Sequence, residues 1–192
     1  MELKEILDRC REGDQLAWEA LVRSFQGRVY GIACHYLGNS EDARDAAQEI
    51  FVRIYRNLGR SIDERRFVPW MVRISRNICV DHIRRRKSRP PAHDLPCDKL
   101  PALADGRENP EEHWAAGSRK RMIYRAMRNL SHVSREIILL KDILGLPLEE
   151  ISSQLAVPLG TVKSRCNRAR IELAERVLAL AQPRLNDTGG DK

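Results

Sequence analysis

The sequence has few aromatic side chains and no long apolar run, and each shortage removes a class of proteins. Phe, Trp and Tyr make up 5% of the 192 residues, while 32% are charged and 42% are hydrophobic. This composition describes a folded, helical protein rather than a β-sandwich or a disordered chain. The longest tight apolar run, Ile137 to Leu140, is far shorter than the roughly 18–20 residues that a membrane span needs.

The sequence also lacks the motifs of common catalytic sites. It has no G-x-S-x-G, no phosphate-binding loop and no H-E-x-x-H, and its five His residues are scattered singly. We therefore expect neither an enzyme nor a bound cofactor, and we assign no catalytic residue. The first residues, Met1 to Glu5, lack the apolar segment of a signal peptide, so we expect the protein to stay in the cytoplasm.

Cysteine is sparse and shows no pairing by spacing. The five residues are an odd number and include no C-x-x-C pair, which in a reducing compartment favours free, buried thiols. A zinc site is the alternative, because Cys79-x-x-His82 followed by His93-x-x-x-Cys97 supplies four ligands at a usable spacing. We predict no metal ligand, because the first pair lies inside a helical pattern with another role.

Positive charge dominates, and its distribution divides the chain. The net charge is +7. Residues 1–89 hold 18 Lys and Arg against 13 Asp and Glu, residues 90–118 hold 2 against 6, and residues 119–184 hold 13 against 6. Two basic blocks that flank an acidic stretch favour a polyanionic partner such as nucleic acid.

Apolar spacing predicts an all-α fold of two small helical domains joined by a flexible linker. The first domain covers residues 1–89, with Gly38 ending one helix and Asn39 or Ser40 capping the next. Its last helix begins near Phe67, with Pro69 in the first turn, after a polar loop over residues 59–66. We expect four helices in this domain, over residues 3–11, 18–36, 40–58 and 67–87.

The proline-rich, acidic residues 90–118 are typical of an extended linker. A helix start at Asn109-Pro110 leads into the second domain, residues 119–182, which is followed by a polar tail over 183–192. In this domain Ser131 is expected to cap a helix that ends near Gly145. The apolar stripe of that helix is Val133, Ile137, Leu140 and either Ile143 or Leu144.

A short helix, a tight break and a long basic helix lie between Leu146 and Ala174, and this order is typical of a helix-turn-helix. The long helix has a continuous apolar stripe of Val162, Cys166, Ala169, Leu173 and Val177. Side chains near its N-terminus on the opposite face are candidates for reading DNA, namely Thr161, Ser164, Arg165 and Arg168. The alternative is a basic amphipathic helix packed in an ordinary bundle.

Two helices of the first domain carry further candidate surfaces. The helix over 67–87 combines cations, an aromatic ring and polar groups, as binding to melted DNA requires. These residues are Trp70, Arg73, Arg76, Asn77, Asp81, Arg84 and Arg85. Trp70 could equally be a core residue, and the arginines a charged helix end. The helix over 40–58 has an acidic and amide-bearing face, which is either a solvated surface or a docking surface: Asp42, Asp45, Gln48 and Glu49, with Phe51 close by.

Three segments, in this order and spacing, resemble the sigma-70 family of bacterial transcription initiation factors, and specifically its small extracytoplasmic-function (ECF) group. They are Glu41 to Phe51, Phe67 to Asn77 with Asp81 and Arg84, and Gly160 to Arg165 with Arg168-Ala169-Arg170. The match extends over about residues 10–180. The sequence departs from the usual pattern at Ala46-Ala47 and Cys166, where larger aliphatic residues are common.

The resemblance implies a dissociable subunit of RNA polymerase that recognises promoters. The acidic face with Phe51 would dock on the β′ coiled coil of core polymerase, and the second domain would contact the β flap. The helix from Trp70 to Arg85, with the 59–66 loop, would melt and hold the −10 element of promoter DNA. The long basic helix would read the −35 element with Thr161, Ser164, Arg165 and Arg168, and Lys163 would take part as well.

The short polar tail adds no regulatory domain, so the resemblance further implies control by a separate anti-sigma factor, often membrane-bound. Two rival functions remain. One is a stand-alone helix-turn-helix regulator, which would bind duplex DNA tightly without polymerase. The other is an antagonist or adaptor that keeps this fold but does not support initiation.

Overall fold

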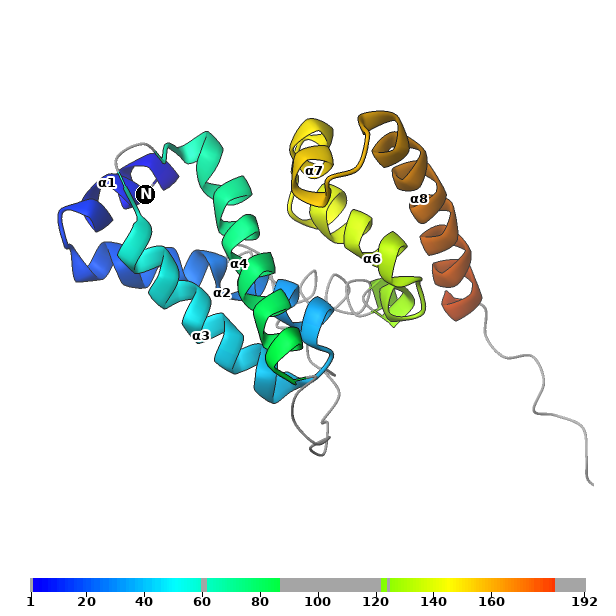
Figure 1. Cartoon of the computed structure of the whole chain (residues 1–192), viewed down its shortest axis with the longest axis horizontal. Coiled ribbons are helices and arrows are strands. Elements are labelled where there is room, and N and C mark those ends of the chain that lie inside the picture. The colour runs from blue at the N-terminus through cyan, green and yellow to red at the C-terminus, as the bar shows by residue number, and fades with distance from the viewer. Residues whose placement is uncertain (1, 60–61, 87–121, 124, 182–192) are drawn as a thin grey trace, which may run out of the picture.

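A computed structural model describes residues 2–59, 62–86, 122–123 and 125–181, and every regular element within these ranges is a helix (Figure 1). The all-α prediction is therefore confirmed. The predicted linker, the predicted helix start at Asn109 and the polar tail lie outside the described residues.

The first helical group contains four helices, and the second of them is its centre. They are α1 (Leu3–Arg11), α2 (Gln15–Leu37), α3 (Ser40–Asn57) and α4 (Glu64–Arg86). Helix α2 packs against the other three, and α3 also packs against α4. The largest fully buried side chains come from all four helices: Leu7, Leu21, Ile32, Ile50, Ile54, Phe67 and Met71.

Local capping groups fix where α2 and α3 begin and end. The Asp14 carboxylate accepts hydrogen bonds from the backbone N–H groups of Leu16 and Ala17, at 2.8 and 3.2 Å. Gly38 ends α2 with φ of 78°, a left-handed conformation that glycine adopts without a Cβ penalty. The Asn39 side chain then accepts from the N–H of Asp42 at 2.7 Å, so Asn39, rather than Ser40, caps α3.

Helix α4 begins at Glu64, three residues before the expected start at Phe67. Asp63 provides the start, because its carboxylate accepts from the N–H of Arg66 at 2.8 Å and its carbonyl accepts from Phe67 at 2.9 Å. Pro69 therefore lies inside the helix rather than in its first turn. The last three residues of the loop expected over 59–66 are therefore helical.

The second helical group contains α6 (His132–Ile138), the π-helical turn η1 (Leu139–Ile143), α7 (Leu148–Leu155) and α8 (Leu159–Ala181). Helix α8 packs against α6 and α7, and α7 also contacts η1. The cap predicted at Ser131 is confirmed, because its hydroxyl accepts from the N–H of Ser134 at 3.1 Å.

The expected apolar stripe of this segment is wrong at Val133, which is 45% exposed. The four consecutive residues from Ile137 to Leu140 are instead all buried. A regular helix stripe cannot bury four residues in a row, but this segment has two neighbours, since α8 packs against α6 and α7 packs against η1. The turn also widens, as the N–H of Leu144 donates to the Leu139 carbonyl five residues earlier, at 3.0 Å.

Removal of the α3 cap tests how far this helix depends on one side chain. Asn39→Ala should lower the free energy of unfolding by about 1 kcal/mol, because the half-buried N–H of Asp42 in the first turn of α3 loses its acceptor. Urea titration followed by circular dichroism measures this loss. Asn39→Ser, which keeps an oxygen acceptor, should recover most of it; equal losses in both variants would contradict the capping role.

Candidate nucleic-acid and partner interfaces

Helices α7 and α8 form a helix-turn-helix with a tightly bonded turn. Ala156 has φ of 53°, and the N–H of Val157 donates to the Ser152 carbonyl at 3.1 Å. The Ser152 hydroxyl donates in turn to the Val157 carbonyl at 2.6 Å. These bonds fix the direction in which α8 leaves the turn.

Helix α8 buries one stripe and exposes a polar face near its N-terminus. Val162, Cys166 and Ala169 are buried, whereas Leu173 is only partly buried. Among the predicted DNA-reading residues, Lys163, Ser164 and Arg168 are exposed and Thr161 and Arg165 are half-buried. Arg170, in the middle of α8, donates to the Asp142 carboxylate of η1 at 2.6 Å, and this bond ties the helix to η1. The carboxylate also raises the pKa of Arg170.

Helix α4 exposes a mixed stripe of cations and polar groups along its length. The exposed members are Arg73, Asn77, Asp81, Arg84 and Arg85. Two predicted members differ from these. Trp70 is half-buried, with its ring 6.0 Å from that of Phe67, so it belongs partly to the core. Arg76 points toward the second helical group, where its Nε lies 3.7 Å from a carboxylate oxygen of Glu136.

The predicted acidic face of α3 divides into exposed and internally bonded residues. Asp45 and Gln48 are exposed, and Phe51 is half-buried. Asp42 is half-buried and accepts from the Asn39 cap residue. Glu49 is also half-buried and lies 2.9 Å from Nε2 of His82 on α4, so it joins two helices.

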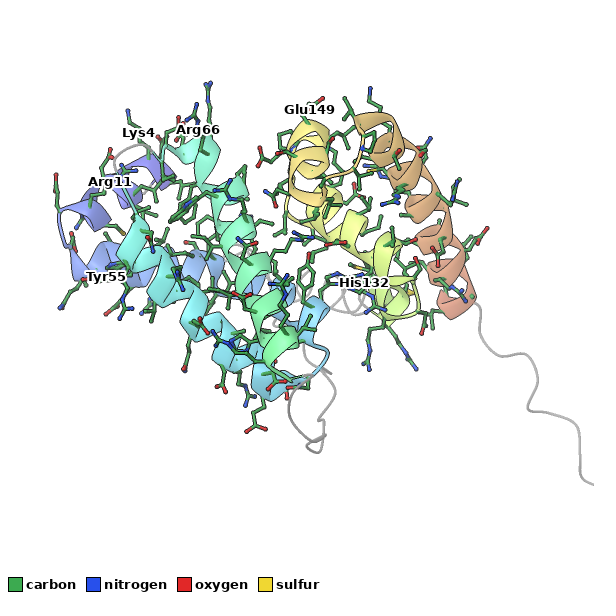
Figure 2. The ribbon with its side chains drawn as sticks, in the orientation of Figure 1. Lys4, Arg11, Tyr55, Arg66, His132 and Glu149 are labelled. Carbon is green, nitrogen blue, oxygen red and sulfur yellow. The ribbon has the colours of Figure 1, made fainter. Side chains whose placement is uncertain are left out.

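Two exposed apolar residues extend the outer face of α3 and were not among the sequence candidates. Val52 is 48% and Tyr55 62% exposed, and the Tyr55 ring lies 5.0 Å from that of Trp18 (Figure 2). They follow Asp45 and Gln48 by seven residues each, which places all four on one side of the helix. This side is opposite the buried Ile50 and Ile54. Because these two residues form an apolar stripe that is visible in the sequence, the sequence could have indicated that Val52 and Tyr55 face outward.

The cysteines within the described ranges are Cys10, Cys34, Cys79 and Cys166, all free and buried. Burial raises the pKa of Cys10 to about 11 and that of Cys79 to about 12. No group of three or more potential metal ligands occurs in the described part of the chain, where His82 is bonded to Glu49. His93 and Cys97, the other half of the zinc alternative, lie outside it.

A histidine pair lies between the two helical groups. The ring of His35 on α2 lies 4.8 Å from that of His132 on α6, and neither nitrogen of His35 has a hydrogen-bond partner among the described residues. Burial lowers the pKa of His35 to about 3, with further contributions from His132 and Arg135. Arg135 is held in place by the carbonyls of residues 127, 128 and 130, at 2.8 to 3.1 Å.

The helix-turn-helix of α7 and α8, beside a four-helix group with exposed cations on α4, defines a two-part DNA-binding protein of the helix-turn-helix class. Among the described helices, none is long and apolar enough to cross a membrane.

Comparison with known proteins agrees with both parts. The family description "Sigma-70 region 2" matches residues 21–89, and "Sigma-70, region 4" matches residues 120–173. The RNA polymerase sigma-H factor of Pseudomonas aeruginosa is 30% identical over 87% of this chain and 89% of its own length. The ECF RNA polymerase sigma factor SigW of Bacillus subtilis is 31% identical over 92% of this chain and 97% of its own.

Solved structures show the same fold. CnrH, in complex with the cytosolic domain of CnrY, aligns with a TM-score of 0.56 and 23% identity, over 93% of this chain and 98% of that one. RpoE of Bartonella quintana, in complex with the anti-sigma factor NepR, aligns with a TM-score of 0.55 and 20% identity, over 85% and 96%.

The chain therefore belongs to the sigma-70 family of RNA polymerase sigma factors, in its ECF group. It binds RNA polymerase and directs it to specific promoters at transcription initiation. The resemblance drawn from the three sequence segments is confirmed.

The largely desolvated His35 makes stability sensitive to acid. Unfolded His35 takes up a proton below about pH 6.5 while the folded residue stays neutral, so the free energy of unfolding falls as the pH falls. Between pH 6.5 and 5 the native protein should lose about 2 kcal/mol more than His35→Leu, which has no such group. Urea titrations at several pH values measure the difference, and parallel pH curves for the two proteins would contradict it.

Proposed function

We propose that three surfaces of this sigma factor divide the work of initiation. The outer face of α3 docks on the β′ coiled coil of core polymerase, the exposed stripe of α4 holds the melted −10 element, and the N-terminal half of α8 reads the −35 element. The observation that supports this assignment best is that each surface lies on a helix face opposite the core. All three can therefore be occupied without unfolding the protein.

The docking surface on α3 joins two kinds of contact. Asp45 and Gln48 supply a charge and an amide, while Val52 and Tyr55 supply exposed apolar area one and two turns further along. A protein interface typically has an aromatic centre within a polar rim, and Tyr55 is suited to that central position. Asp42, Glu49 and Phe51 support this surface rather than form its outermost part.

The DNA surfaces use different chemistry. On α4, Arg73, Arg84 and Arg85 suit phosphate contacts, while Asn77 can bond base edges and the accessible part of the Trp70 ring can stack on a base. On α8, Lys163 and Arg168 suit phosphates, and Arg165 with Ser164 suits base edges in the major groove. The two modules on one chain raise affinity only for DNA with both elements at the right spacing.

We further propose that the second domain contacts the β flap. The protein acts in the cytoplasm under the control of an anti-sigma factor, and this partner is bound to the membrane. Support for the anti-sigma factor comes from a solved structure of related fold, since RpoE was solved in complex with the anti-sigma factor NepR.

The direct test is transcription by purified core polymerase on a fragmented genomic library, with and without the protein, followed by sequencing of RNA 5′ ends. New start sites that share two spaced upstream elements would support the proposal. Binding to core without new starts would favour an antagonist or adaptor. Tight binding to duplex DNA alone would favour a stand-alone regulator.

Charge reversal tests the docking surface. Asp45→Lys should weaken binding to core polymerase at least about tenfold, because it places the wrong charge within the contact while α3 stays folded. Fluorescence anisotropy of labelled protein titrated with core measures this. Asp45 is preferred to Glu49, whose replacement would also break the bond to His82. Glu5→Lys on α1 is the matched control; equal affinities for the two variants would remove the docking assignment.

Truncation of one arginine tests the −35 surface. Arg165→Ala should reduce discrimination at one −35 base pair by roughly 1–3 kcal/mol, because the guanidinium is suited to bidentate bonding with guanine. Run-off transcription on templates substituted at each −35 position measures it. Arg176→Ala, exposed near the other end of α8, should leave the preference unchanged. The placement of α8 fails if both variants keep the native preference.

A further inference from the structure

The cations of α4 begin earlier along the helix than the candidate set indicated. Because the helix starts at Glu64, Arg66 lies inside its first turn, and its side chain is exposed. The exposed members Arg73, Asn77 and Arg84 follow it by 7, 11 and 18 residues, which are close to two, three and five whole helical turns. Arg66 therefore continues the exposed stripe of α4 on the same side of the helix.

The first turn of α4 has little packing of its own. Residues 63–66 are all exposed, and the first buried side chain of the helix is Phe67. Pro69 has no N–H group, so it cannot donate to the Arg65 carbonyl four residues earlier, and one bond fewer joins the first turn to the rest of the helix. The place of Arg66 is therefore sensitive to contacts from outside α4.

Arg11, the last residue of α1, supplies such a contact. Its guanidinium donates to the backbone carbonyl of Ile62, and the next residue, Asp63, accepts from the N–H of Arg66. Helices α1 and α4 are in contact, and Figure 2 shows Arg11 and Arg66 at the same end of the first helical group. Because the acceptor belongs to the backbone, this bond holds the chain itself at the point where α4 begins.

The guanidinium of Arg11 is oriented by its own helix. One turn earlier on α1, the Asp8 carboxylate accepts a hydrogen bond from Nη1 at 2.5 Å, which leaves Nη2 for Ile62. The Arg11 side chain is only 18% exposed, and a charged donor that is shielded from water makes a strong hydrogen bond. Helix α1 is itself fixed, since it packs against α2 and buries Leu7 and Cys10.

We propose that Arg66 is a further contact of α4 with the DNA strand at the −10 element, and that Arg11 is its positioning residue. This inference rests on the proposed function of α4. The Arg66 guanidinium binds a phosphate next to those held by the cations further along the stripe. Arg11 touches no DNA, but it holds the Ile62 carbonyl and thereby the turn that presents Arg66. Helix α1, which precedes the residues matched to sigma-70 region 2, thus takes part in holding the strand.

The test measures how the full-length protein, assembled with core polymerase, binds a fork-junction probe. The probe is duplex through the −35 element and single-stranded at the −10 element, and its sequence comes from a start site found by RNA 5′-end sequencing. Fluorescence anisotropy at several salt concentrations gives the affinity and its salt dependence. Circular dichroism checks that each variant remains helical.

Arg66→Ala should weaken probe binding at least about threefold and lower the slope of log affinity against log salt by about 0.7, as the loss of one single-strand phosphate contact requires. Arg11→Met keeps the length of the side chain but removes its donors, and it should also weaken binding about threefold. Arg9→Met is the matched control on the same helix, because Arg9 bonds Asp14 at the turn into α2. This control should stay within about 1.5-fold of the native protein.

A double-variant cycle separates positioning from stability. If Arg11 acts through Arg66, Arg11→Met should change the affinity of the Arg66→Ala protein by less than about 1.5-fold, because the side chain that it positions is gone. A general loss of stability would instead lower the affinity by the same factor in both backgrounds. Asp8→Ala removes the carboxylate that orients Arg11 and should show the same dependence on Arg66, which keeps the test open if Arg11→Met folds poorly.

Three results would overturn the proposal, and each removes a different part of it. If Arg11→Met binds as Arg9→Met does, or weakens binding equally with and without Arg66, Arg11 is not a positioning residue, and the proposed function is unaffected. If Arg66→Ala binds as the native protein does while Arg73→Ala binds more weakly, the stripe does not extend to the first turn. If neither Arg66→Ala nor Arg73→Ala weakens binding, α4 is not the surface for the −10 strand, and the proposed function of this helix fails as well.

Discussion

The packing of α2 against its neighbours is the constraint on which the rest of the first domain depends. Because α3 and α4 each bury one stripe against α2, the opposite face of each helix is fixed in direction. Buried Ile50 and Ile54 turn Asp45, Gln48 and Tyr55 outward. The direction in which the candidate side chains of α3 and α4 point is therefore set by core packing, and no loop has to position them.

Sequence periodicity was sufficient for the helices because it reports burial directly. The bounds of α1, the cap at Ser131 and the helix-turn-helix follow from spacing and capping residues. The start of α4 was misplaced because Pro69 suggested a first turn, whereas Asp63 provides an earlier cap. The stripe through Val133 is wrong because a π turn, with α8 packed on α6 and α7 on η1, lets Ile137 to Leu140 be buried together.

The candidate sites were predictable in their helix faces but not in their partners. A sequence shows that Arg76 and Glu49 are charged and where each lies on its helix. It does not show that Arg76 lies 60 residues along the chain from its partner Glu136, or that Glu49 meets His82. Tertiary packing decides which charges remain available to ligands, and it divides each predicted set into exposed members and internally bonded ones.

The bond between Glu49 and His82 has a mechanical consequence. It joins α3 to α4, and the two helices also pack directly on each other. A pull applied to α3 by the transcription machinery would pass to α4 through this brace without a hinge between them. If α3 and α4 have the proposed roles, the docking helix and the strand-holding helix move as one stiff unit, and adjustment between promoter elements comes from the other half of the molecule.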